Sequence, residues 1–297
     1  MTNTLTIKNL HYSVNNKKIL NDISFESHNG IIALLGNNGV GKTTLMNIIA
    51  GILKPDSGEV YLNEASLSSH SSYPIDLVGY LPQNFEIYDN ITGYDFLSYV
   101  YDLKRLSSQN KKQVLADIIE EFNLNNVAHK KVRTYSGGYK RRLGIAQAVI
   151  GRPKLVIIDE PTVGLDPQQR IEFRKFLSEI SLNTITLIST HIIEDVELFS
   201  DRLLIIGDDH SLKFNGSINE IISLTSNHLM TATIPKTELA EIRKKFEVIE
   251  EKRITNELVK IKYVNSESYL DEIPNSCIEE EVSLENAYIH FQKLQNQ

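Results

Sequence analysis

The fold expected for this chain follows from Ile31-Ile32-Ala33-Leu34-Leu35-Gly36-Asn37-Asn38-Gly39-Val40-Gly41-Lys42-Thr43-Thr44. The five apolar residues favour a buried strand, and a helix is expected over 42–52. Between them, the sequence matches G-x-x-x-x-G-K-[ST], the pattern of a loop that wraps phosphate. Its glycines let successive N–H groups point inward, and the helix adds its positive end. We therefore expect residues 36–44 to bind a nucleotide, with Lys42 on its β- and γ-phosphates and the Thr43 hydroxyl on Mg²⁺.

A second segment, Leu155-Val156-Ile157-Ile158-Asp159-Glu160, ends in two acids. Its apolar run is short and suits a strand that is buried on both faces. Asp159 at the end of such a strand can hold the Mg²⁺ shell, and Glu160 can orient an attacking water or accept its proton. Considered alone, the two acids also fit an ordinary solvated strand end.

Further motifs occur in order along the chain, and each also has an ordinary structural explanation. Tyr135-Ser136-Gly137-Gly138-Tyr139 would open a helix, either as a simple serine cap or as an anion site made by N–H groups and a hydroxyl. The other motifs are Gly79-Tyr80-Leu81-Pro82-Gln83, Gly164-Leu165-Asp166-Pro167, Ser189-Thr190-His191 and an aromatic residue at Tyr12.

With these motifs in this order, residues 4–224 resemble the ABC ATPases. The Ser-Gly-Gly core of the family's signature loop is intact, whereas Tyr135 and Tyr139 replace the family's usual Leu and Gln. The resemblance implies catalytic roles for Lys42, Gln83, Glu160 and His191, and Mg²⁺ ligation by Thr43, Gln83 and Asp159. It implies nucleotide contacts by Tyr12 on adenine, by Gly36, Asn37, Asn38, Gly39, Val40, Gly41, Lys42, Thr43 and Thr44, by Ser136, Gly137 and Gly138, and by Asp166 of the D-loop.

The order of elements predicts the fold class. Strands alternate with helices, which implies an α/β sheet rich in parallel strands, and residues 93–123 have a helical pattern. The resemblance adds the arrangement of a P-loop NTPase of the ABC type, with a RecA-like core, an antiparallel β subdomain and a helical signature subdomain. Residues 220–297 hold 14 Asp and Glu against 9 Lys and Arg. We therefore predict an ABC ATPase domain over 4–224 and a small accessory α/β domain over 225–297.

Charge and hydropathy bear on whether the chain binds nucleic acid or spans a membrane. The formal net charge of the 297 residues is −7, which argues against bulk attraction to nucleic acid, and none is expected as a partner. No uninterrupted apolar window of about 18 residues occurs, so we do not expect the chain to span a membrane. The resemblance implies instead a peripheral subunit at the cytoplasmic face of the cell membrane.

The resemblance also implies how such a subunit assembles. Two subunits pair head to tail around two ATP molecules, so that the phosphate loop of one faces Ser136, Gly137 and Gly138 of the other. The second subunit is either an identical copy or a sister protein. The pair acts on a separately encoded integral-membrane permease through the groove beside Gln83, and we expect this groove to include Phe85, Ile87 and Tyr88.

Two segments look like the ABC-2-type branch that exports drugs, antibiotics or peptides: Ser136-Gly137-Gly138-Tyr139-Lys140-Arg141-Arg142-Leu143 and Ser283-Leu284-Glu285-Asn286-Ala287-Tyr288. The basic triplet also fits a solvated helix face. An ABC importer subunit shares all the catalytic motifs and stays an alternative. The other alternative is an ABC ATPase of translation or DNA repair, but such proteins usually add a coiled coil, a zinc module or a second cassette, and the sequence shows none of these marks.

Overall fold

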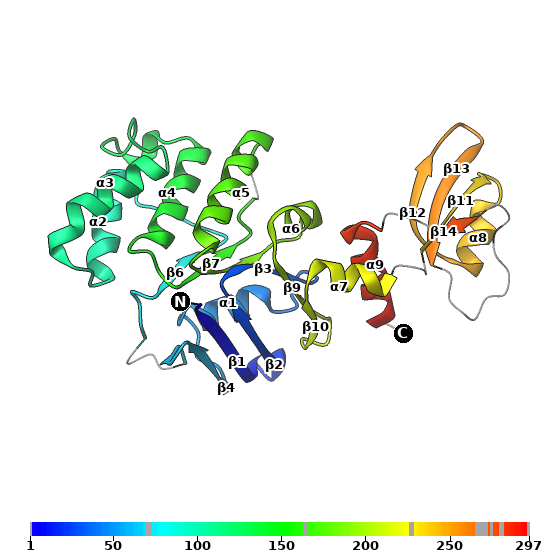
Figure 1. Cartoon of the computed structure of the whole chain (residues 1–297), viewed down its shortest axis with the longest axis horizontal. Helices are drawn as coiled ribbons and strands as arrows, with labels where there is room; N and C mark the ends of the chain where they lie inside the picture. The colour runs from blue at the N-terminus through cyan, green and yellow to red at the C-terminus, as the bar shows by residue number, and fades with distance from the viewer. Residues whose placement is uncertain are drawn as a thin grey trace. The chain divides into compact units, whose positions relative to one another are not determined.

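The computed structural model describes residues 2–68, 73–162, 165–225, 229–264, 273, 276–278 and 282–295 (Figure 1). The chain divides into two compact units, Met1–Asn215 and Gly216–Gln297. Each unit has a sheet and a hydrophobic core of its own, so the two are described in turn.

A six-stranded sheet forms the centre of the first unit, in the order β10-β9-β3-β8-β7-β6. β3 runs parallel to β8 and β9, and β7 runs parallel to β6 and β8. Every residue of β7 and β8 is buried, as expected for strands covered on both faces. The predicted α/β class is confirmed. The strands are β3 (Gly30–Leu35), β6 (Val78–Leu81), β7 (Leu155–Asp159), β8 (Ile185–Ser189), β9 (Arg202–Ile206) and β10 (Leu212–Gly216).

A four-stranded antiparallel sheet in the order β2-β1-β4-β5 packs against this core. Leu5 and Ile7 of β1 are buried on one face, and they share a hydrophobic cluster with Leu34 of β3 and Leu45 of α1. The loop before α1 is therefore anchored in the core at both of its ends. These elements are β1 (Thr4–Val14), β2 (Lys17–His28), β4 (Ser57–Leu62), β5 (Ala65–Ser66) and α1 (Lys42–Ile49).

Helices α2, α3 and α4 lie together in the first unit (Figure 1). The helical stretch expected over 93–123 is interrupted: α2 ends at Leu103, and Arg105 takes a left-handed backbone with φ 55°. Such a residue cannot continue a right-handed helix, so α3 begins anew at Lys111. The helices are α2 (Gly93–Leu103), α3 (Lys111–Glu121), α4 (Gly137–Val149), α5 (Pro167–Ser181) and α6 (Ile193–Phe199).

The second unit has an antiparallel sheet in the order β12-β13-β11-β14. Ile234, Ile261 and the fully buried Tyr263 form its core, with Ile242 of α8 packed on them. Two further helices, α7 and α9, pack against each other. The elements are α7 (Ile218–Thr225), β11 (Leu229–Pro235), α8 (Leu239–Lys245), β12 (Glu247–Arg253), β13 (Leu258–Val264), β14 (Cys277–Ile278) and α9 (Leu284–Gln295).

The boundary between the two compact units lies after Asn215 in the sequence, whereas the change in composition predicts it after residue 224. The physical reason is the position of α7. Its last residue, Thr225, is fully buried, and the hydroxyl Oγ1 lies 3.0 Å from Nδ1 of His290 in α9. Thus α7 belongs to the second unit. Among the residues that the structure describes, no helix has the length and apolar character needed to cross a membrane.

Candidate active site

The loop over residues 36–44 joins β3 to α1 and closes tightly on its surroundings. Gly36 and Gly41 have φ values of 147° and 110°, which side-chain-bearing residues rarely adopt. A Cβ on Gly36 would lie 2.6 Å from the Ile206 carbonyl oxygen, and one on Gly41 would lie 2.4 Å from the Ile19 carbonyl oxygen. The loop can therefore take this shape only with glycine at both positions.

Lys42 folds back over this loop. Its Nζ donates hydrogen bonds to the Gly36 carbonyl at 2.7 Å and to the Asn37 carbonyl at 3.1 Å. The residue is only 8% exposed, and burial lowers the pKa of its amine, while the charges of Glu160 and Asp159 oppose that shift. A buried ammonium whose partners are neutral carbonyls is a favourable partner for an arriving phosphate.

Asp159, at the end of β7, is 1% exposed and accepts two hydrogen bonds. The Thr43 hydroxyl donates to Oδ2 at 2.8 Å, and the Ser189 hydroxyl at the end of β8 donates to Oδ1. A carboxylate and a hydroxyl from elements far apart in the sequence thus lie together, because β7 and β8 are neighbours in the sheet. The sequence places Ser189 in the Ser189-Thr190-His191 motif, but it carries no signal for the bond from Ser189 to Asp159.

Glu160 follows Asp159 and has a left-handed backbone, with φ 48°. Its N–H donates to the Ser189 hydroxyl at 2.9 Å, and its Oε2 lies 2.8 Å from Nδ1 of His191. Glu160 is 8% exposed, whereas the His191 side chain is 58% exposed. The structure therefore brings these two predicted catalytic residues into direct contact.

A cavity of about 470 Å³ brings together part of the predicted nucleotide site. The phosphate loop, the two acids and Gln83 all face it. Ile19 lines it as well, and sequence reasoning missed this residue because an apolar side chain in a hairpin carries no chemical signal. The lining residues are Ile19, Asn38, Gly39, Gly41, Lys42, Thr43, Thr44, Gln83, Asp159 and Glu160.

Tyr12 is not among the residues that line this cavity. It lies in β1 opposite Leu20, half-buried, and packs against the hydrophobic cluster of the first unit. Two other residues predicted in the loop have different contacts. The side-chain amide of Asn37 donates a hydrogen bond to Oδ1 of Asp208 at 2.9 Å. The carbonyl oxygen of the buried Val40 lies 3.2 Å from Nδ1 of His210. These two loop residues therefore connect to the turn after β9.

The Ser-Gly-Gly segment lies outside the Lys42 cavity. Ser136 caps α4, and its hydroxyl accepts from the Tyr139 N–H at 3.4 Å. A Cβ on Gly137 would meet no atom within 4 Å, so this corner of the loop is open, whereas one on Gly138 would lie 2.7 Å from Nε2 of Gln169 in α5. The N-terminal end of α4 is therefore open at Gly137, and it is not part of the Lys42 cavity.

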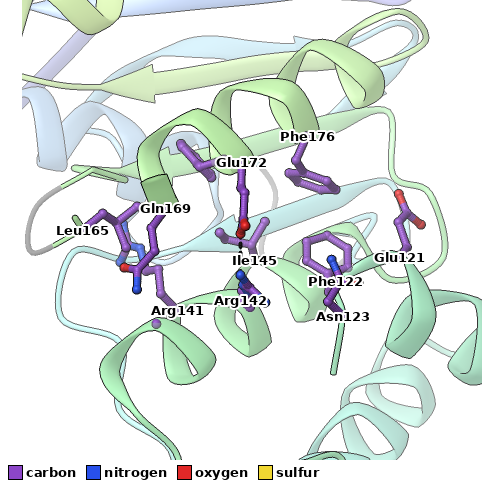
Figure 2. Close-up of a pocket in the computed structure, with 12 residues that line it drawn as sticks. Glu121, Phe122, Asn123, Arg141, Arg142, Ile145, Leu165, Gln169, Glu172 and Phe176 are labelled. Carbon is purple, nitrogen blue, oxygen red and sulfur yellow. Dashed lines mark hydrogen bonds and ion pairs between the residues drawn. The ribbon is translucent and has the colours of Figure 1, made fainter. Parts of the chain in front are cut away.

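Asp166 is exposed and caps α5, accepting from the Gln169 N–H at 2.9 Å. Gly164 of the predicted D-loop lies outside the described residues. Leu165, Gln169 and Gly138 also border a smaller cavity of about 80 Å³ between α4 and α5, shown in Figure 2.

The groove expected beside Gln83 is only partly an open surface. Gln83 and Tyr88 are exposed, and Tyr88 is 85% accessible. Phe85 instead packs against other residues. Its ring contacts the ring of Phe96 edge-on, with 5.9 Å between the ring centroids, and its Cδ1 would lie 2.7 Å from a Cβ added to Gly144 of α4. Phe85 thus packs within the helical part of the unit, whereas Tyr88 is an exposed aromatic residue of the same segment.

Arg141 of α4 also belongs to the site, and the alternative of a purely solvated basic face is wrong for this residue. Its Nη2 donates to the Glu160 carbonyl at 2.8 Å, and its Nε donates to the Pro161 carbonyl at 3.1 Å. Sequence reasoning noted the basic triplet without this contact, because it depends on how α4 packs beside the end of β7.

Comparison with known proteins agrees with this geometry. The family described as ABC transporter matches residues 20–163. The uncharacterized ABC transporter ATP-binding protein YdbJ of Bacillus subtilis is 40% identical over 208 residues, which are 68% of this chain and 66% of that protein. The linearmycin resistance ATP-binding protein LnrL of the same organism is 33% identical, over 68% of this chain and 66% of that protein.

The lipopolysaccharide export system ATP-binding protein LptB of Haemophilus influenzae is 31% identical, over 68% of this chain and 86% of that protein. A solved structure of an ATP-binding subunit of an ABC transporter superposes with a TM-score of 0.67 at 27% identity, covering 74% of this chain and 92% of that one. The phosphate loop, the acidic end of β7 and these similarities lead to one conclusion. The chain belongs to the ATP-binding subunits of ABC transporters, and it is an ATPase of that family.

Proposed function

We propose that this ATPase powers the export of a drug, antibiotic or peptide through a separately encoded integral-membrane permease. The observation that carries the export assignment is the similarity to LnrL and LptB, whose names refer to linearmycin resistance and to lipopolysaccharide export. An importer subunit, which shares the catalytic motifs, and an ABC ATPase of translation or DNA repair are the alternatives to this proposal.

In the proposed reaction, Lys42 exchanges its loop carbonyl partners for oxygens of the β- and γ-phosphates. This neutralises charge on the phosphates where it develops during hydrolysis. Glu160 lines the same cavity and orients the attacking water, accepting its proton. His191 holds the Glu160 carboxylate from the solvent side and contacts the γ-phosphate.

The site also suits Mg²⁺ by the chemistry of its donors. Thr43 and Asp159 present a hydroxyl and a carboxylate 2.8 Å apart, and the Gln83 amide lines the same cavity. Mg²⁺ prefers oxygen ligands from one or two carboxylates together with substrate phosphates. When bound, the ion would neutralise charge on the β- and γ-phosphates. Thr43, Asp159 and Gln83 are the residues proposed to hold it.

The proposed active form is a head-to-tail pair of ATPase subunits, identical or sister. Ser136 and Gly137 support this arrangement because they stand at an open helix N-terminus, away from the cavity of their own chain. A nucleotide bound at Lys42 of one subunit would then be contacted by these N–H groups of the other subunit. Asp166 caps the first turn of α5, and we propose that its loop lies at the same junction.

We assign permease docking to the segment that carries Gln83 and Tyr88. An exposed aromatic residue near a nucleotide-contacting amide can couple the state of the site to a membrane partner. The second unit, Gly216–Gln297, is proposed to act as an accessory domain that modulates pairing or docking and contributes no catalytic group. In support, none of the residues that the structure describes in this unit is among those that line the Lys42 cavity.

Affinity purification of the tagged full chain from native membranes tests the transporter role. The expected result is co-purification of a polytopic membrane protein whose presence stimulates ATP hydrolysis and ATP-dependent substrate efflux in vesicles. Recovery of ribosomes or DNA-repair proteins, without any polytopic protein, would overturn the proposal. Substrate accumulation inside right-side-out vesicles would instead identify an importer.

A further inference from the structure

The backbone of Glu160 is held at both of its polar groups. The Ser189 hydroxyl accepts from its N–H, and the Arg141 guanidinium donates to its carbonyl. Such a clamp matters because a φ of 48° is unfavourable for a residue with a side chain and persists only where the surroundings enforce it. The direction of the Glu160 carboxylate depends on this backbone conformation.

The contacts of Arg141 are suited to hold Glu160 in this backbone conformation. One planar guanidinium spans two consecutive carbonyls, those of Glu160 and Pro161, and a rigid fork of donors fixes both together. The side chain is half-buried, and burial lowers the pKa of the guanidinium while the Asp159 charge opposes this effect. Without Arg141, carbonyls beside the buried Glu160 would lose their charged donor, which is unfavourable in a desolvated site.

The neighbouring arginine behaves differently. Arg142 forms an ion pair with Glu172 of α5 and lies 5.6 Å from the ring centroid of Tyr139. Figure 2 shows Arg142 directed across the small cavity at Glu172, whereas Arg141 lies on the side of Gln169 and Leu165. Two adjacent arginines on one helix therefore contact separate elements, and only the contacts of Arg141 reach the Glu160 backbone.

We propose that Arg141 is a positioning residue that fixes the Glu160–Pro161 backbone and thereby aims the Glu160 carboxylate at the attacking water. Arg141 stands one helical turn after Gly137 on α4, so it also connects the open end of this helix to Glu160 of the same chain. In a head-to-tail pair, contact of one subunit's ATP with α4 of the other would reach the other subunit's Glu160 through this arginine. The inference rests on the proposed role of Glu160.

The test is a double-mutant cycle on the purified full chain with Mg-ATP. Arg141→Ala should lower kcat on the order of tenfold, because a small displacement of a reacting group has effects of that size, and should leave the ATP dissociation constant within about twofold. In a Glu160→Gln background, Arg141→Ala should change the residual rate by less than about twofold, because an effect exerted through Glu160 is then already lost. Arg141→Lys, which keeps one charged donor, should recover part of kcat.

Arg142→Ala is the matched control, since it removes a guanidinium and an ion pair from the same helix. It should leave kcat within about twofold of wild type. A thermal unfolding midpoint is measured for every variant, and if Arg141→Ala does not fold, the cycle is run with Arg141→Lys. Equal rate losses in the two backgrounds, or a loss that follows ATP affinity, would overturn the inference. If Glu160→Gln by itself keeps the wild-type rate of hydrolysis, both the proposed role of Glu160 and the inference about Arg141 fail. The transporter role is tested separately, because this cycle is measured on the purified chain without a permease.

Discussion

Nδ1 of His191 lies 2.8 Å from Oε2 of Glu160, so an exposed imidazole holds a buried carboxylate from the solvent side. Glu160 directly follows β7, and His191 follows β8, the neighbour of β7 in the sheet. Glu160 also lines the cavity of Lys42 and Asp159. The carboxylate of Glu160 thus links His191 to the Lys42 cavity.

Glu160→Gln should bind ATP with a dissociation constant within about twofold of wild type, because the amide keeps the shape of the side chain. The amide is a poor base, so kcat should fall by roughly a hundredfold, and an ATP-bound dimer should accumulate. Phosphate release and size-exclusion chromatography with ATP measure the two effects. Glu197→Gln, an exposed acid on α6, serves as the control. Hydrolysis at the wild-type rate by Glu160→Gln would remove Glu160 from the mechanism.

His191→Ala should lower kcat on the order of tenfold or more, since the carboxylate loses the partner that orients it. ATP should still bind, because the substitution leaves Lys42 and the other residues of the phosphate loop unchanged. Equilibrium titration with a fluorescent ATP analogue and steady-state kinetics separate the two quantities. His28→Ala, which changes an exposed histidine at the end of β2, should match wild type in both. An unchanged kcat for His191→Ala would contradict the assigned role.

Lys42→Ala should weaken ATP binding itself. The lost charge-assisted hydrogen bonds correspond to about 2 kcal/mol of binding free energy, or roughly thirtyfold in the dissociation constant. Isothermal titration calorimetry with Mg-ATP measures this change. The control is Lys54→Ala, which removes an exposed lysine between α1 and β4 and should bind normally. If Lys42→Ala binds ATP as tightly as wild type, the lysine does not hold phosphate.

Lys104 predicts a pH dependence of stability. It is buried, and its Nζ donates to the Ile150 carbonyl at 3.1 Å near the end of α4. Burial lowers the pKa of Lys104 from 10.5 to about 8, with the Asp76 charge opposing the shift. Between these two pKa values the unfolded chain binds more protons than the folded chain, so stability rises with pH in this window.

Relative to Lys104→Met, the wild-type free energy of unfolding should therefore increase by about 2 kcal/mol between about pH 7.5 and 9.5. Urea denaturation at several pH values measures the difference. Lys130→Met changes an exposed lysine and should show no such pH-dependent difference from wild type. Parallel curves for wild type and Lys104→Met across this window would contradict the lowered pKa.

Tyr88→Asp should detach the subunit from membranes that hold its permease, because an exposed aromatic anchor at the centre of an interface can carry a few kcal/mol of binding free energy. Basal ATP hydrolysis should stay within about twofold of wild type, since the side chain does not line the Lys42 cavity. Membrane co-sedimentation and phosphate release check the two outcomes. Leu182→Asp changes another exposed apolar side chain, after α5, and should remain bound. Retention of Tyr88→Asp on membranes would place docking elsewhere.

Sequence alone was sufficient for elements whose signal is local. The apolar run ending in Asp159 predicts the buried strand β7, and the glycine pattern with Lys42 and Thr43 predicts the loop and the helix after it. Periodicity, caps and glycine spacing are properties of neighbouring residues, so a single sequence carries them in full.

Tertiary structure decided which of these residues meet. The sequence does not tell that Ser189 bonds to Asp159 or that Arg141 clamps the Glu160 carbonyl, because both contacts depend on β7 lying between β8 and β6 and on α4 packing beside it. Phe85 and Tyr88 are equally aromatic in sequence, yet one is packed and the other exposed. Local patterns specify the elements, whereas the packing of elements distant in the chain specifies which side chains share a site.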